Sequence, residues 1–90
     1  MKEVVPLNYE NVKDTMKGIY RKVLDRDIDD AVFDPGDDLI HTLFIDSLLA
    51  LQMLILMEQE FSIVIEDDAL AIELLNDINK ACNYILSVTS

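Results

Sequence analysis

The chain has 90 residues, 51% of them hydrophobic and 28% charged, so it can bury one small core and is too apolar to be disordered. Eighteen acidic residues against seven basic ones give a formal net charge of -11. Phosphate groups repel such a surface, which argues against nucleic acids and anionic membranes and favours protein partners with a basic surface. We expect one domain over residues 1–90, present as a monomer.

The cysteine content and the N-terminal sequence predict a cytoplasmic protein. The one cysteine, Cys82, has no partner for an internal disulfide, which suits a reducing compartment. The N-terminal segment includes Glu3 and lacks an apolar run of signal-peptide length. The longest apolar stretch, Leu48–Met57, is about half of the roughly 20 residues that cross a bilayer, so we expect no contact with a membrane.

Helical spacing dominates the sequence, and two glycines and two prolines leave little material for hairpins. A first helix should begin at a cap on Asn8 or Asn11 and fray over Asp25–Asp30. Its apolar face consists of Val12, Met16, Ile19, Tyr20 and Val23. A long connection over Asp25–Asp46 follows, with turn chemistry at Asp34-Pro35-Gly36. Its expected tethers to the core are Val32, Phe33, Leu39, Ile40, Leu43 and Phe44.

The second helix, predicted over Ser47–Glu60 with Asp46 or Ser47 as its cap, is apolar on both sides. At 100° per residue, one side collects Leu48, Leu51, Leu54, Ile55 and Phe61. The opposite side, where an amphipathic helix should be polar, collects Leu49, Gln52, Met53 and Leu56. The helix is either buried all round or exposes an apolar strip, and so short a chain cannot surround it. We therefore assign Leu49, Gln52, Met53 and Leu56 to a docking strip for partner proteins.

Two more helices complete the predicted fold. After an extended piece at Phe61–Ile65, the acidic cluster Glu66-Asp67-Asp68 should cap a short third helix over Ala69–Leu74. The fourth helix follows Asp77 as its cap. Its apolar face consists of Ile78, Ala81, Cys82, Ile85 and Leu86. The sequence thus predicts an all-α four-helix bundle with three main helices, a short third helix and a long first loop.

Three patterns that could indicate a catalytic or metal-binding site lack residues that such a site requires. The acidic run from Asp25 suggests a calcium loop, but it has Asp30 where that loop needs glycine and Gly36 where it needs glutamate. Ser47, His41 and Asp46 form the only possible Ser–His–acid set, and no glycines flank the serine as in a nucleophile elbow. One histidine and one cysteine cannot build a zinc site. We expect no catalytic residues and no metal site.

Ser47 has two interpretations. A serine at the start of a helix is commonly a cap that accepts a backbone hydrogen bond. A phosphate esterified to the same hydroxyl would lie beside free backbone N–H groups at the positive end of the helix dipole. Such a site needs no lysine or arginine, which suits a chain with so few of them.

The sequence around Ser47 resembles the acyl carrier protein family. The motif Asp46-Ser47-Leu48 opens an apolar helix that ends in Glu58-Gln59-Glu60-Phe61, and Ile63-Val64-Ile65-Glu66-Asp67-Asp68 follows. Further matches are Asp37-Asp38-Leu39-Ile40 upstream and Asp77-Ile78 and Tyr84-Ile85 in the last helix. The resemblance covers most of the chain, about Val12–Leu86.

This resemblance implies a four-helix bundle that carries 4′-phosphopantetheine from coenzyme A on Ser47. Asp46 and Leu48 would shape the motif that a phosphopantetheinyl transferase recognises. The thiol of the arm would hold an acyl or aminoacyl thioester and present it to a loading enzyme and to synthase or tailoring enzymes. The domain itself would catalyse nothing, and the tether would raise the effective concentration of the cargo at each active site.

Two departures from the family bear on partners and cargo. Phe44 stands where the family commonly has glycine, and Leu49 and Gln52 replace acids that fatty-acid carriers have on the outer face of this helix. The sequence looks closest to discrete carriers of polyketide and mixed polyketide–peptide pathways, those with alkoxymalonyl-type extender units being nearest. The alternatives are a discrete aminoacyl or peptidyl carrier and a helical interaction module with an unmodified Ser47.

Overall fold

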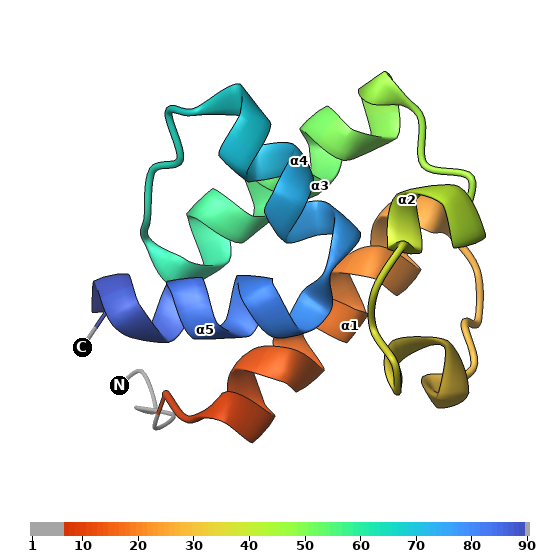
Figure 1. Cartoon of the computed structure of the whole chain (residues 1–90), viewed down its shortest axis with the longest axis horizontal. Coiled ribbons are helices and arrows are strands. Elements are labelled where there is room, and N and C mark those ends of the chain that lie inside the picture. The colour runs from red at the N-terminus through yellow and green to blue at the C-terminus, as the bar shows by residue number, and fades with distance from the viewer. Residues whose placement is uncertain (1–6, 90) are drawn as a thin grey trace.

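A computed structural model of the chain describes residues 7–89, and the regular elements over this range are all helical (Figure 1). In chain order they are α1 (Tyr9–Leu24), η1 (Asp30–Phe33), α2 (Leu39–Thr42), α3 (Ser47–Phe61), α4 (Asp68–Asn76) and α5 (Ile78–Thr89). The predicted all-α class is therefore confirmed, and α1, α3, α4 and α5 are the four expected helices. None of the helices within the described range is both long and apolar enough to cross a bilayer.

Each of these four helices begins after a side chain that accepts a hydrogen bond from the first turn. Asn8 accepts from the backbone N–H of Asn11 at the start of α1, and Asp46 accepts from that of Leu49 at the start of α3. Asp67 accepts from the N–H of Leu70 before α4, and Asp77 accepts from those of Asn79 and Lys80 before α5. These are short-range bonds between residues two or three positions apart, so the sequence indicates the helix starts closely. The third predicted helix is longer than expected, because it begins at Asp68 and ends at Asn76.

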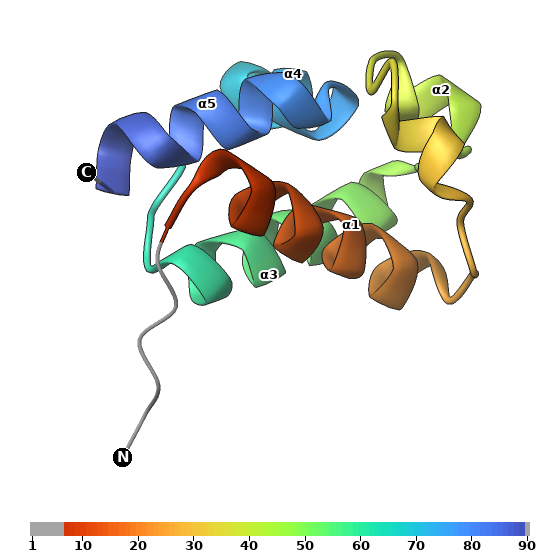
Figure 2. The ribbon, with the colours of Figure 1, turned by 90° about the horizontal axis from the view of Figure 1, so that it is seen from below.

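The helices form two layers, with α1 beside α3 in one and α4 beside α5 in the other (Figure 2). Contacts between α1 and α5 and between α3 and α4 join the layers. The core lies between them. Its fully buried side chains from the four helices are Val12, Met16, Tyr20, Met53, Met57, Leu75, Ile78, Ala81, Cys82 and Ile85.

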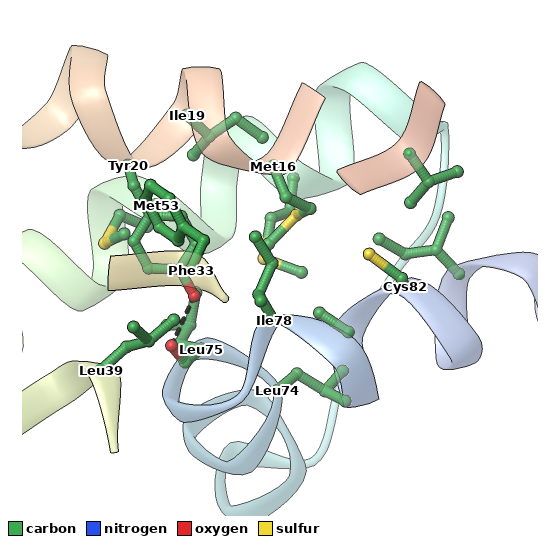
Figure 3. Close-up of a cluster of buried hydrophobic side chains, with 14 of the residues drawn as sticks. Met16, Ile19, Tyr20, Phe33, Leu39, Met53, Leu74, Leu75, Ile78 and Cys82 are labelled. Atoms are coloured by element: carbon green, nitrogen blue, oxygen red, sulfur yellow. Dashed lines mark hydrogen bonds between the residues drawn. The ribbon is translucent and has the colours of Figure 1, made fainter. Parts of the chain in front are cut away.

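Tyr20 and Phe33 pack against each other in the middle of this core (Figure 3). The Tyr20 hydroxyl donates a hydrogen bond to the carbonyl of Leu75, so its polar end is satisfied although the side chain is fully buried. The rings of Tyr20 and Phe33 meet edge to face, with centroids 5.4 Å apart. Burial raises the pKa of Tyr20, because the charged phenolate would have to exist without water.

The connection between α1 and α3 is more structured than the sequence indicates, since η1 and α2 lie within it. Phe33 and Leu39 are fully buried, as predicted for tethers, and Leu43 is nearly so. Ile28 and Ile45 are additional buried residues of this segment. The prediction that Phe44 is a tether is wrong: its side chain is 81% exposed.

The turn at Asp34-Pro35-Gly36 is present, and it joins the connection to α5. Gly36 has φ +73°, a conformation that side chains disfavour. Its carbonyl accepts a hydrogen bond of 2.9 Å from the backbone N–H of Ile78. A Cβ atom at this position would lie 2.8 Å from Cγ2 of Ile78, so glycine is required for the close approach as well as for the turn.

The orientation of α3 differs in part from the predicted one. Leu48, Leu51 and Ile55, which lie opposite the predicted docking strip, are 63%, 53% and 43% exposed, whereas Phe61 from the same side is buried. Met53, which we placed on the docking strip, is fully buried. The helix is apolar on every side, so its own periodicity does not select an inner face. Packing against the neighbouring helices makes this choice.

Candidate functional site

Ser47 is the first residue of α3, and its side chain is exposed to solvent. The hydrogen bond that caps the helix comes instead from Asp46, whose Oδ1 atom accepts from the backbone N–H of Leu49 at 2.8 Å. Within residues 7–89 the Ser47 hydroxyl makes no hydrogen bond. The two interpretations of Ser47 therefore separate: Asp46 does the capping, and the Ser47 hydroxyl is free to react.

The backbone at the start of α3 suits a phosphate group on Ser47. Asp46 occupies the N–H of Leu49, and the Asp46 carbonyl accepts from the N–H of Ala50. The N–H groups of Ser47 and Leu48 have no acceptor within the described residues. Unpaired N–H groups at the positive end of a helix attract phosphate oxygens without help from a basic side chain. The residues present thus fit a phosphodiester at this hydroxyl.

Three hydrogen bonds fix the turn that precedes Ser47. Ile45 donates its backbone N–H to the carbonyl of Ile40 at 2.9 Å, which closes the end of α2. Nη2 of Arg26 donates to the carbonyl of Leu43 at 2.7 Å, and Oδ1 of Asn76 accepts from the backbone N–H of Ile40 at 3.0 Å. Contacts from the end of α1 and the end of α4 therefore fix the segment immediately before the serine.

A groove between α3 and α4 begins at Ser47. Its volume is about 350 Å³. It is lined by Ser47, Ala50, Leu51, Leu54, Asp68, Ala71, Ile72 and Leu75. Six of these eight residues are apolar, so the groove offers an apolar path that starts at the free hydroxyl. No pattern within the sequence indicates this groove, because its two walls come from residues some twenty positions apart.

The outer face of α3 is apolar and uncharged. The exposed residues along it are Leu48, Leu51, Gln52 and Ile55. The helix has no charged residue from Ser47 to Met57, although the chain has 18 acidic residues. Of the four residues predicted for the docking strip, Gln52 lies on this face, Leu49 and Leu56 are half-buried against the core, and Met53 cannot contribute.

A second groove lies beside this face, between α1 and α3. It has a volume of about 370 Å³ and is lined by Lys22, Val23, Gln52, Ile55 and Leu56. Gln52 and Ile55 therefore border both the outer face of α3 and this groove. The apolar surface next to Ser47 continues around the helix toward α1.

The remaining polar candidates are engaged elsewhere. Nδ1 of His41 lies 3.4 Å from Oδ2 of Asp38, and Oδ1 of Asp46 accepts from the backbone N–H of Leu49; within residues 7–89 neither side chain is hydrogen-bonded to Ser47. Asp30 pairs with Arg21 at 2.8 Å and Lys17 at 3.3 Å. The hydrogen bonds from Arg21 and Lys17 lower the pKa of Asp30. Residues 7–89 contain no group of three or more His, Cys, Asp or Glu side chains placed to hold a metal ion.

Cys82 is a core residue, as the sequence predicts. Its side chain is fully buried, and burial is the main reason that the pKa of its thiol rises to about 11. A thiol with a raised pKa is a poor nucleophile at neutral pH. Cys82 is therefore not expected to react in place of the thiol of a prosthetic arm.

Comparison with protein families gives one match. The family model described as "Phosphopantetheine attachment site" matches residues 14–85. This range includes α3 with Ser47, the turn that presents it and both walls of the apolar groove. No curated protein and no solved structure matches the chain significantly.

Proposed function

Because this chain belongs to the phosphopantetheine-attachment family, we propose that Ser47 bears the covalent 4′-phosphopantetheine arm of that family and that the protein is a stand-alone acyl carrier. Membership confirms the expected cofactor and the role of a carrier, and carriers of this family are in general not enzymes. They work with a phosphopantetheinyl transferase and with synthase enzymes. The observation that supports Ser47 is its free, exposed hydroxyl at the start of a helix that is capped by another residue.

The chemistry of attachment follows from the position of this hydroxyl. Oγ of Ser47 attacks the phosphorus of coenzyme A that bears the pantetheine, and its proton passes to a base of the transferase. A bond forms between Oγ and phosphorus, the bond from phosphorus to the bridging oxygen breaks, and adenosine 3′,5′-bisphosphate leaves. The unpaired N–H groups of Ser47 and Leu48 would be the donors available to the phosphodiester. When bound, the arm supplies a thiol that carries the cargo as a thioester.

The outer face of α3 is the proposed docking surface for partner enzymes. It starts beside Ser47, and Leu48, Leu51 and Ile55 together expose a row of apolar side chains along the helix. A partner that covers this face gains affinity from apolar burial, whereas a rim of charges would mainly speed encounter. Asp46 and Leu48 serve the transferase, Asp46 by fixing the start of the helix and Leu48 by its exposed side chain.

For the cargo, we propose an acyl unit of a polyketide or mixed polyketide–peptide pathway, of the alkoxymalonyl-type extender class. The support is the resemblance of the segment around Ser47 and the replacement by Leu49 and Gln52 of the acids that fatty-acid carriers have on this face of α3. An aminoacyl or peptidyl cargo is the second candidate, which the same uncharged stretch from Ser47 to Met57 supports. Mass spectrometry of the protein isolated from its native host distinguishes them, because the fragmented arm reports the mass of its thioester.

The experiment that tests attachment uses coenzyme A, Mg²⁺ and a broad-specificity phosphopantetheinyl transferase. We expect the intact mass to increase by one phosphopantetheine in the wild type and not in Ser47→Ala. Ser62→Gly is the matched control, because Ser62 is another exposed serine, at the far end of α3, and has φ +54°, which glycine tolerates. A wild type that gains no mass would favour the alternative of an unmodified interaction module. A Ser47→Ala variant that gains mass would place the arm elsewhere.

A further inference from the structure

Phe44 combines two unfavourable features at one position. Its side chain is 81% exposed, and its backbone is in the left-handed region with φ +54°. The other non-glycine residues with positive φ in the described range are Asp25, Asp38 and Ser62. These are small polar residues at helix ends, where this conformation is common. Phe44 is the one apolar residue among them, and a bulky side chain in this region is unusual.

The fold explains the backbone of Phe44 but not its side chain. Phe44 follows the last turn of α2, and its N–H donates to the carbonyl of His41 at 3.3 Å. Its neighbours Leu43 and Ile45 are both buried, so the chain must reverse at Phe44 and direct the ring outward. Glycine would make the same turn without strain. Folding alone therefore does not account for phenylalanine here.

The position of Phe44 limits what can cover its ring. It lies three residues before Ser47, and the exposed Leu48 follows directly after the serine. Enzymes that act on the cargo meet the far end of a flexible arm, so they can stand away from the serine. The transferase must bring coenzyme A within bonding distance of the Ser47 hydroxyl. Its contact surface therefore includes the segment from Phe44 to Leu48.

We propose that Phe44 is a specificity-determining residue whose ring fills an apolar pocket of the phosphopantetheinyl transferase that modifies Ser47. This inference rests on the proposed function. Aromatic side chains are frequent anchors in interfaces, and an anchor that is already held in place loses little freedom on binding. The hydrogen bonds of Arg26 and Ile45 around this turn hold the backbone of Phe44, so the ring points to solvent before any partner arrives.

The test is steady-state kinetics of phosphopantetheine transfer to the apo protein, with coenzyme A, Mg²⁺ and the phosphopantetheinyl transferase of the native host. For Phe44→Ala and Phe44→Gly we expect KM to rise about tenfold or more with kcat within about twofold of the wild type, because uniform binding is lost. Phe44→Tyr keeps the ring and should restore KM. Val64→Ala is the matched control: Val64 is 71% exposed and lies beyond the far end of α3, about 20 Å of helix from Ser47.

Phe44→Gly also separates recognition from folding. It removes the strained side chain, so its melting temperature should be at or above that of the wild type while its KM rises. A Phe44→Ala variant whose kcat/KM stays within about twofold of the wild type would overturn the inference, and so would a fall in kcat at unchanged KM. If the wild type itself receives no arm, the proposed function fails, and this inference fails with it. Modification of the wild type and all Phe44 variants with equal kcat/KM overturns the inference alone.

Discussion

Ser47 is exposed at the first position of α3, while the capping bond of this helix comes from Asp46. Because the Ser47 hydroxyl stabilises nothing within the described residues, we expect Ser47→Ala to change the free energy of unfolding by no more than about 0.5 kcal/mol. Loss of a true cap costs about 0.5–2 kcal/mol, so Asp46→Ala should be the more destabilised variant. Chemical denaturation of both variants measures the difference. A larger decrease in the free energy of unfolding for Ser47→Ala than for Asp46→Ala would mean that Ser47, and not Asp46, caps the helix.

Cys82 and the thiol of the arm should behave differently toward a thiol reagent. Cys82 is fully buried and its pKa is raised to about 11, so it should react slowly in the folded protein. Ellman's reagent should therefore detect one thiol in the native modified protein and a second only after denaturation. Rapid reaction of the native unmodified protein would contradict this. Because the folded pKa is raised, the stability contribution of Cys82 is present below about pH 8.5 and decreases as pH rises toward the folded pKa.

The helix α3 has an exposed side and a buried side, which paired substitutions distinguish. Leu51 is 53% exposed, so Leu51→Glu should alter the free energy of unfolding by no more than about 0.5 kcal/mol. Met53 is fully buried, and Met53→Ala should cost about 2–5 kcal/mol through the cavity that it leaves. Thermal or chemical denaturation distinguishes the two. Equal destabilisation would mean that the outer face is not exposed in solution.

The same Leu51→Glu variant tests docking. A charge on the apolar face should weaken the Kd for the cargo-loading enzyme about tenfold, which corresponds to about 1.4 kcal/mol. Leu49→Glu is a less clean test than the sequence suggests, because Leu49 is half-buried against the core and a glutamate there would also destabilise the fold. An unchanged Kd in Leu51→Glu, at unchanged stability, would remove the outer face from the interface with that enzyme.

Across the whole molecule, negative charge is unevenly compensated. Residues 27–79 contain no lysine or arginine, and most of the basic residues lie on or next to α1. The ion pairs between lysine or arginine and a carboxylate in the described range involve Asp30, with Lys17 and Arg21, and Glu73, with Lys80. Many of the other acids therefore repel one another at neutral pH, and the screening of this repulsion is expected to stabilise the fold.

Added salt should accordingly raise the melting temperature of the apo protein, with divalent cations effective at lower concentration. Differential scanning calorimetry over a range of NaCl and MgCl₂ concentrations measures this. The double variant Glu66→Gln and Asp68→Asn is a suitable control, since both side chains are exposed and the cap of α4 comes from Asp67. It should melt higher at low salt and respond less to salt. A melting temperature that is insensitive to salt would show that repulsion is unimportant.

The sequence alone determined the features that depend on neighbours along the chain. Asn8, Asp46 and Asp77 cap helices through bonds to residues two or three positions away, so the starts of α1, α3 and α5 could be predicted. The apolar spacing of α1 and α5 indicated their inner faces for the same reason, because each has a polar side. The motif at Ser47 also identified the candidate attachment residue, although the pattern left open whether it was a cap.

Only the tertiary structure decided which side of α3 faces the core, how the long connection folds and where a groove forms. The helix α3 is apolar all round, so Met53 and Leu51 are equivalent until α1 and α4 pack against it. The single turns η1 and α2 are too short to be stable alone, and burial of Phe33 and Leu39 holds them. Phe44 is apolar, as core residues usually are, yet its ring points outward because its neighbours Leu43 and Ile45 are buried. Each of these outcomes depends on contacts between residues far apart in the chain, which local periodicity does not encode.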